Sequence, residues 1–171
     1  MGHSGTLDPK ATGLMILGVG KGTKKLTSLI GLDKVYEATI DFSKMSDTWD
    51  LGYWEKYEEV PVLITPSPFG DSLWQGSNIS TPTRQQLENK LSLLVPEYEL
   101  PLPAFSAKKK EGKRLYTLAR SGQEISETKV MRVQSFEILK YNFPVLRLRL
   151  AVGSGTYIRS IGYWLGQEFG L

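Results

Sequence analysis

The sequence predicts an α+β fold, because it contains both strand-like and helix-like periodicities. Residues 34–42 and 144–153 alternate between apolar and polar side chains, which is the period of a strand with one buried face. Residues 87–94 and 158–169 instead carry apolar side chains three or four positions apart, as one face of a helix requires. These periodicities support the fold class and leave the order of the strands open.

Length and composition limit the classes of protein that this chain can represent. Its 171 residues suffice for one domain with a sizeable core, and 40% apolar with 23% charged residues is typical of a soluble globular protein. No apolar run is long enough to span a membrane and the start lacks a signal-peptide pattern, so a cytoplasmic location is expected. The absence of cysteine excludes disulfides and thiolate chemistry, and a single histidine argues against a metal site.

The start of the chain holds the densest group of chemically useful side chains. Residues 2–9 contain two glycines, the single histidine His3 and the carboxylate of Asp8. Glycine allows the backbone to turn or to approach another segment closely, and Pro9 restricts the chain after Asp8, so Asp8 is expected on a held turn. The same spacing also fits an ordinary helix start, with Asp8 as the cap.

The first half of the chain predicts several short elements. The apolar run 14–19 predicts a buried strand behind the Asp8 turn. Residues 23–30 predict a short helix that Thr23 caps, with Leu26, Leu29 and Ile30 on one face and Gly31 as its end. The strand 34–42 places Tyr36 on its apolar side, where an ordinary core tyrosine is the alternative to a functional one. Residues 53–80 predict a loop that leaves room for one strand.

The second half predicts a helix, two strands and a final helix. Thr81 and Pro82 favour a helix start, and Pro96 ends that helix. Strands are expected at 129–139 and 144–153, followed by a turn into the helix that carries Ile158, Ile161, Leu165 and Phe169 on its buried side. Arg159 lies in the first turn of this helix, an unfavourable place for a cation unless it faces an anion; a solvated arginine is the alternative.

Several runs of residues resemble the TruB family of tRNA pseudouridine synthases, in the family's order and at about its spacing. The resemblance covers residues 1–52 and 103–170 and is weak between them. It departs from the family's pattern at Ser43, where glycine is usual, and at Trp49, where a small residue is common. The runs that carry it are residues 2–14, 20–24, 34–37, 46–50, 103–108, 112–116, 119–120, 155–160 and 165–166.

This resemblance implies a fold and a division of the chain. The expected architecture is the pseudouridine synthase fold, a mixed and mostly antiparallel sheet flanked by helices, with a thumb-like RNA-binding insertion at about 101–123. The family normally has a preceding segment and a continuation beyond Gly170, so residues 1–171 are expected to be a partial catalytic domain.

The resemblance also implies a reaction and its residues: the isomerisation of uridine to pseudouridine at position 55 in the T loop of tRNA. Asp8 would be the nucleophile, and Arg159 would keep it ionised and orient it. Tyr36 and Tyr157 would lie against the target base, with the Tyr36 phenol as a catalytic group that assists proton transfer at C5, and His3 would fill the space that the flipped base leaves. The reaction has no redox step and no group donor, so no cofactor is expected. The other residues expected to contact the RNA are Gly5, Thr6, Asp47, Asp50, Lys108, Lys113, Arg114, Tyr116 and Arg120.

The charge of the chain is distributed unevenly along the sequence. Residues 104–120 hold six basic residues against one acid, whereas residues 44–75 hold six acids against two basic residues. A polyanion is attracted to the first region and repelled by the second, and aromatic residues among the cations suit unpaired bases. A solvated helix face is the alternative explanation of the basic run.

Two other functions remain open from the sequence. One is a non-catalytic RNA-binding or tRNA-folding fragment, which the missing flanking segments would favour. The other is a guide-RNA-dependent, dyskerin-like pseudouridine synthase, which shares the run from His3 to Lys10, although the segment 103–120 favours the stand-alone type. The chain is expected to act as a monomer with the T arm of tRNA as its partner.

Overall fold

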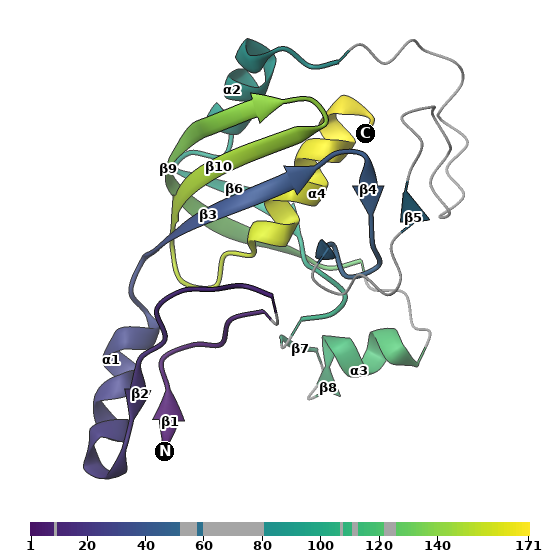
Figure 1. Ribbon diagram of the computed structural model, residues 1–171. Helices are drawn as coiled ribbons and strands as arrows, with labels where there is room; N and C mark the ends of the chain where they lie inside the picture. Colours follow the sequence, from purple (N-terminus) through teal and green to yellow (C-terminus); the bar gives the residue numbers. More distant parts are fainter. Residues whose placement is uncertain (9, 52–57, 60–80, 107, 111–112, 122–125) are drawn as a thin grey trace.

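The computed structural model describes residues 1–8, 10–51, 58–59, 81–106, 108–110, 113–121 and 126–171. Its largest sheet has four strands in the order β3-β10-β9-β6, and each pair of neighbours is antiparallel. These strands are β3 (Lys34–Asp41), β10 (Val145–Val152), β9 (Thr128–Asn142) and β6 (Glu97–Pro101). The antiparallel sheet with flanking helices confirms the expected fold class (Figure 1).

The alternation in β10 decides which face of the sheet is buried. Leu146, Leu148 and Leu150 are fully buried and Val152 nearly so, and they share one core cluster with residues of α2 (Arg84–Ser92) and α4 (Ile158–Phe169). Both helices therefore cover the same face, as the helical spacing of their apolar residues predicts. In β3, Tyr36 pairs with Leu150 and so faces this side of the sheet.

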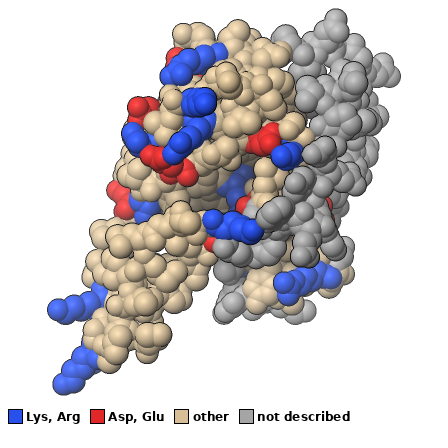
Figure 2. All heavy atoms as spheres, in the orientation of Figure 1, with Lys and Arg blue, Asp and Glu red and all other residues tan. Residues whose placement is uncertain are grey.

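The other face of the sheet carries charged side chains. Arg147 donates to Glu37 at 2.7 Å, and Arg149 bridges Glu37 at 2.9 Å and Glu137 at 2.8 Å. The hydrogen bonds from these arginines lower the pKa of the Glu37 carboxyl. Figure 2 shows charges of both signs gathered over the sheet. Arg147 and Arg149 occupy the exposed positions of β10, so the predicted alternation of residues 144–153 between a buried and a polar face is confirmed.

The first helix of the main core begins later than the sequence predicted. Thr83, rather than Thr81 or Pro82, is the N-cap of α2. The Thr83 hydroxyl accepts from the Gln86 amide, and the Gln86 side chain accepts from the Thr83 amide at 2.7 Å, which forms a capping box. This reciprocal pairing satisfies two backbone donors and fixes the start of the helix.

The N-terminal elements form an arm beside the sheet (Figure 1). β1 (Gly2–His3) pairs with β2 (Leu17–Gly18), and the 3-10 helix η1 (Gly20–Lys25) continues into α1 (Leu26–Ile30). Leu26 is the one residue of α1 that is buried. A Cβ atom at Gly18 would lie 2.9 Å from the Leu26 side chain and 3.0 Å from the Thr23 backbone, so this contact requires glycine.

Two predictions about this arm are wrong. The run 14–19 is a strand only at Leu17–Gly18, and Leu14 and Val19 are 88% and 72% exposed, because this segment pairs within the arm and not behind the sheet. Thr23 does not cap the helix, and Ile30 is half-exposed, because five residues of α1 bury only Leu26 against the β1–β2 pair. Gly31 ends α1 as predicted.

The remaining described elements are short strand pairs and a short helix outside the main sheet. β4 (Lys44–Met45) pairs with β5 (Glu58–Glu59), β7 (Lys109–Lys110) pairs with β8 (Lys113–Arg114), and α3 (Leu115–Arg120) follows directly. Apart from β5, the loop predicted for residues 53–80 lies outside the described residues. Leu115 is buried in the main core, so the basic segment is anchored at this residue.

The inner face of β10 should carry much of the stability of the domain. Leu148→Ala removes a fully buried side chain and should lower the free energy of unfolding by about 3 kcal/mol. Val35→Ala, at a position that is 67% exposed on the other face, should change it by less than about 0.5 kcal/mol. Urea denaturation measures both, and equal effects of the two substitutions would contradict this assignment of the faces.

Candidate active site

Asp8 lies on a turn in the loop that joins β1 to β2. The Ala11 amide donates to the Asp8 carbonyl at 2.9 Å, and the Ser4 amide donates to the Ile16 carbonyl at 3.0 Å, which holds the two sides of the loop together. The Asp8 side chain is 52% exposed, so its carboxylate is accessible to a substrate. The expected turn at Asp8 is confirmed, while Pro9 lies outside the described residues.

Arg159 brings Asp8 together with two other segments. Its Nε lies 3.3 Å from Asp8 Oδ2, and its Nη1 donates to the carbonyl of Thr48 at 2.9 Å and to that of Phe105 at 3.4 Å. The Arg159 side chain is only 17% exposed, so these acceptors replace much of its hydration. The guanidinium thus joins the Asp8 loop, the loop 46–50 and the start of the basic segment to α4.

Arg159 lies in the first turn of α4, as the sequence predicted, and occupies its second position. No side chain caps this helix, so its first amides and the arginine together form a positive environment. A cation at this position is disfavoured unless an anion faces it, and Asp8 is that anion. Of the two interpretations of Arg159, the structure favours the one with an ionic partner.

Tyr36 lies within electrostatic reach of Asp8. Burial raises the pKa of its phenol above the ordinary value of 10.0, and the negative charge of Asp8 raises it further. The phenol therefore keeps its proton at neutral pH, and it can donate that proton to a hydrogen bond.

The loop 46–50 contributes a backbone group to the site. The Trp49 amide donates to the Ser46 carbonyl at 3.0 Å, and the Asp50 amide donates to the Ser46 hydroxyl at 3.0 Å, so the loop is a closed turn. Its Thr48 carbonyl accepts from Arg159, a contact that sequence reasoning missed. Asp47 is exposed and Asp50 half-buried, and their contact with RNA stays a prediction.

The residues expected to touch RNA at the N-terminus are exposed. Nδ1 of His3 donates to the Gly5 carbonyl at 3.0 Å, which fixes the ring relative to the turn, since a carbonyl only accepts. Gly5 and Thr6 are exposed beside it. Tyr157 is the N-cap residue of α4 and directly precedes the helix that carries Arg159, and its side chain is half-buried.

The basic segment presents cations and an aromatic ring beside the site. Lys108 is exposed, and the Arg120 guanidinium lies 5.6 Å from the centre of the Tyr116 ring on α3, within the range of a cation–π contact. Lys113 and Arg114 belong to β8, and their side chains lie outside the described part of the chain.

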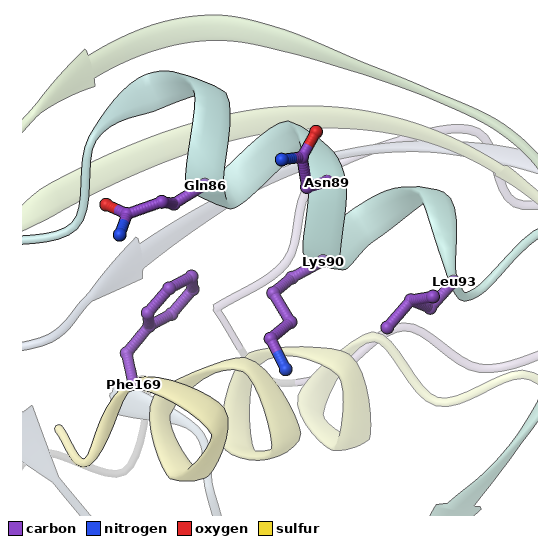
Figure 3. A pocket seen from close by; sticks show the side chains of 5 residues that line it. All are labelled: Gln86, Asn89, Lys90, Leu93 and Phe169. Atoms are coloured by element: carbon purple, nitrogen blue, oxygen red, sulfur yellow. The ribbon is translucent and has the colours of Figure 1, made fainter.

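Other kinds of site receive little support from the structure. Within the described residues, no group of three or more acidic, histidine or cysteine side chains could hold a metal ion, and no helix is long and apolar enough to cross a membrane. A shallow groove of about 380 Å³ lies between α2 and the end of α4 (Figure 3). Its lining includes none of the residues around Asp8, and it consists of Gln86, Asn89, Lys90, Leu93 and Phe169.

A solved structure shares this fold. The protein in the "Crystal Structure of a Cbf5-Nop10-Gar1 Complex" matches with a TM-score of 0.62 and 21% identity, over 99% of this chain and 36% of that one. The architecture is the α+β pseudouridine synthase fold.

Sequence comparison identifies the family. The sequence model described as "TruB family pseudouridylate synthase (N terminal domain)" matches residues 1–63 and 68–158, and the chain belongs to this family. Two relatives named tRNA pseudouridine synthase B come from Opitutus terrae, at 37% identity, and Protochlamydia amoebophila, at 39%. Both matches cover 99% of this chain, which spans 64% and 58% of the lengths of these relatives.

The pKa of Tyr36 offers a test of the site that needs no substrate. Asp8→Asn removes the nearby charge and should lower this pKa, which stays above 10.0 because burial is the larger cause. The tyrosinate absorbance of each variant, measured against the same variant with Tyr36→Phe, isolates this one phenol. Glu97→Gln, an exposed acid on β6, is the control and should leave the titration unchanged. An unchanged Tyr36 titration in Asp8→Asn would contradict the proximity of the two groups.

Proposed function

We propose that this chain converts uridine to pseudouridine in RNA, with uridine 55 in the T loop of tRNA as its target. The observation that carries the proposal is the half-exposed Asp8 carboxylate, held 3.3 Å from a largely buried Arg159. A carboxylate that is oriented by an arginine and open to the outside is suited to act as a nucleophile. The relatives named tRNA pseudouridine synthase B support tRNA as the substrate.

The reaction needs only bond exchange within one nucleotide. The bond between N1 of the base and the ribose breaks, the base turns over, and a bond forms between C5 and the same ribose carbon. The proton on C5 is lost and N1 gains one, so atoms and electrons balance without a redox partner or a group donor. Asp8 is the nucleophile, and an ionised carboxylate serves for attack on either the base or the ribose.

Tyr36 is assigned to stack against the target base and to assist the proton transfer at C5, where a neutral phenol can take up a proton only while it passes its own proton on. Its raised pKa keeps the phenol protonated, so the ring stacks against the base as a neutral group and its hydroxyl takes part in proton transfer near Asp8. Tyr157, at the start of α4, is assigned to the same base. A base that lies against these two rings must first leave the RNA stack, at a cost of a few kcal/mol.

The flanking segments are assigned to RNA binding. The surplus of basic residues at 104–120 starts beside Phe105, whose carbonyl accepts from Arg159, so the cationic segment adjoins the nucleophile. His3, on the same loop as Asp8, is assigned the space that the target base leaves. An RNA whose phosphate backbone lies along the basic segment would bring its own loop, with the target uridine, to Asp8.

Asp8→Asn should abolish turnover and leave RNA binding intact, because the amide keeps the shape of the carboxylate and loses its nucleophilicity. Tritium release from a T-arm stem-loop labelled at C5 of uridine measures turnover, and filter binding of the same RNA measures affinity. Glu97→Gln is the control and should release tritium as the unchanged chain does. Release by Asp8→Asn would contradict the role of Asp8, and no release by the unchanged chain without a guide RNA would contradict the proposed activity.

His3→Ala should impair turnover of full-length tRNA more than turnover of the isolated stem-loop. A folded tRNA loses interactions when its base leaves the loop, and a side chain that fills the space matters most there. The ratio of kcat/KM on the two RNAs measures this difference. An equal loss on both substrates would assign His3 to the chemical step instead.

A further inference from the structure

Trp49 adopts a backbone conformation that a bulky residue rarely takes. Its φ angle is 56°, and it is the one non-glycine residue with positive φ in the described part of the chain. Such a conformation persists only where surrounding contacts enforce it.

The Trp49 ring stacks on a ring of α4. The Trp49 and Tyr163 rings are nearly parallel, with an interplanar angle of 8° and 4.0 Å between their centroids. The Tyr163 side chain is half-buried, and this burial raises the pKa of its phenol. Tyr163 follows Arg159 by one helical turn, so both residues present side chains on the same part of α4.

The Trp49–Tyr163 stack and the hydrogen bond from Arg159 to Thr48 therefore both join the loop 46–50 to α4. Thr48 precedes Trp49 in a closed turn, and its carbonyl accepts from Arg159 Nη1 at 2.9 Å. The ring of Trp49 and the carbonyl of Thr48 are thus held on α4 at adjacent positions of one turn. A guanidinium is planar, so fixing Nη1 also sets the direction of Nε, which lies 3.3 Å from Asp8 Oδ2.

We infer that Trp49 is a positioning residue: its stack on Tyr163 places the Thr48 carbonyl, which orients the Arg159 guanidinium and through it the Asp8 carboxylate. The effect of Trp49 on catalysis rests on the proposed function. Its effect on the orientation of Arg159 rests on the geometry alone. A purely structural role would change the stability of the fold without changing how Arg159 is held.

Substitutions at both rings separate these roles. Trp49→Gly relaxes the backbone and removes the ring; it should lower kcat on saturating stem-loop RNA by about tenfold, with KM changed by less than about twofold. Trp49→Phe and Tyr163→Phe keep a stacked pair and should stay within about threefold of the unchanged chain. Trp49→Gly combined with Tyr163→Leu should be no slower than the slower single variant, because one contact is lost once.

Three kinetic results would overturn the inference: wild-type kcat in Trp49→Gly, equal impairment of Trp49→Gly and Trp49→Phe, or multiplied effects in the double variant. Thermal unfolding of each variant identifies those that fail to fold. If Tyr163→Leu does not fold, the comparison of Trp49→Gly with Trp49→Phe decides alone.

A second readout is independent of turnover, so that failure of the proposed function leaves the inference testable. In isotope-labelled protein, the Arg159 Nε–H signal, identified by its loss in Arg159→Lys, should exchange slowly with solvent because the side chain is only 17% exposed and its Nε lies 3.3 Å from Asp8 Oδ2. Trp49→Gly should speed this exchange about tenfold, while Trp49→Phe should not. Unchanged exchange in Trp49→Gly would overturn the inference even if the enzyme is inactive on every RNA tested.

Discussion

The arrangement of the site depends on how one guanidinium is satisfied. Arg159 has five N–H donors in a fixed plane, and a largely buried cation needs acceptors that match that plane. The acceptors come from three distant parts of the sequence: the carboxylate of Asp8 and the carbonyls of Thr48 and Phe105. Each of these loops is therefore located by the same side chain, which a rigid helix holds in place.

That helix is rigid because its other face is part of the core. Ile161 and Leu165 are fully buried against the sheet, in the same cluster as Leu148. The apolar contacts fix the axis and rotation of α4, and the rotation decides where Arg159 points. The loops around Asp8, Thr48 and Phe105 need little structure of their own, because the packed sheet and helix supply the fixed reference.

For the elements with one buried face, the sequence predicted well which side chains are buried. It predicted poorly which elements pair with one another. The alternation of β10 and the spacing of Ile161 and Leu165 report burial directly, so their faces were correct. Pairing of β3 with β10 is a contact between segments far apart in the sequence, and no local pattern specifies it. The apolar run around Leu14 was misassigned for a related reason: apolar residues indicate that burial would be favourable, but not that another layer is there to cover them.

For the site, the residues with distinctive chemistry could be predicted and the backbone groups could not. Asp8 and Arg159 stand out by type and by resemblance to the family, and the structure brings them together. The carbonyls of Thr48 and Phe105 have no sequence signal, because every residue has one. Trp49 was visible as a departure from the family's pattern, yet its partner Tyr163 required the turn geometry of α4.

The position of Tyr36 in the sheet has a consequence for how the site forms during folding. β9 and β10 are neighbours in sequence and continue into α4, so these elements can assemble from local contacts. Tyr36 instead pairs with Leu150. The long chain segment between these two residues must close before they can pair, and this closure carries an entropy cost that the adjacent strands β9 and β10 avoid. We therefore expect the scaffold around Arg159 to form early and the tyrosine to join it late, so that a partly folded chain would have its arginine in place before its site is complete.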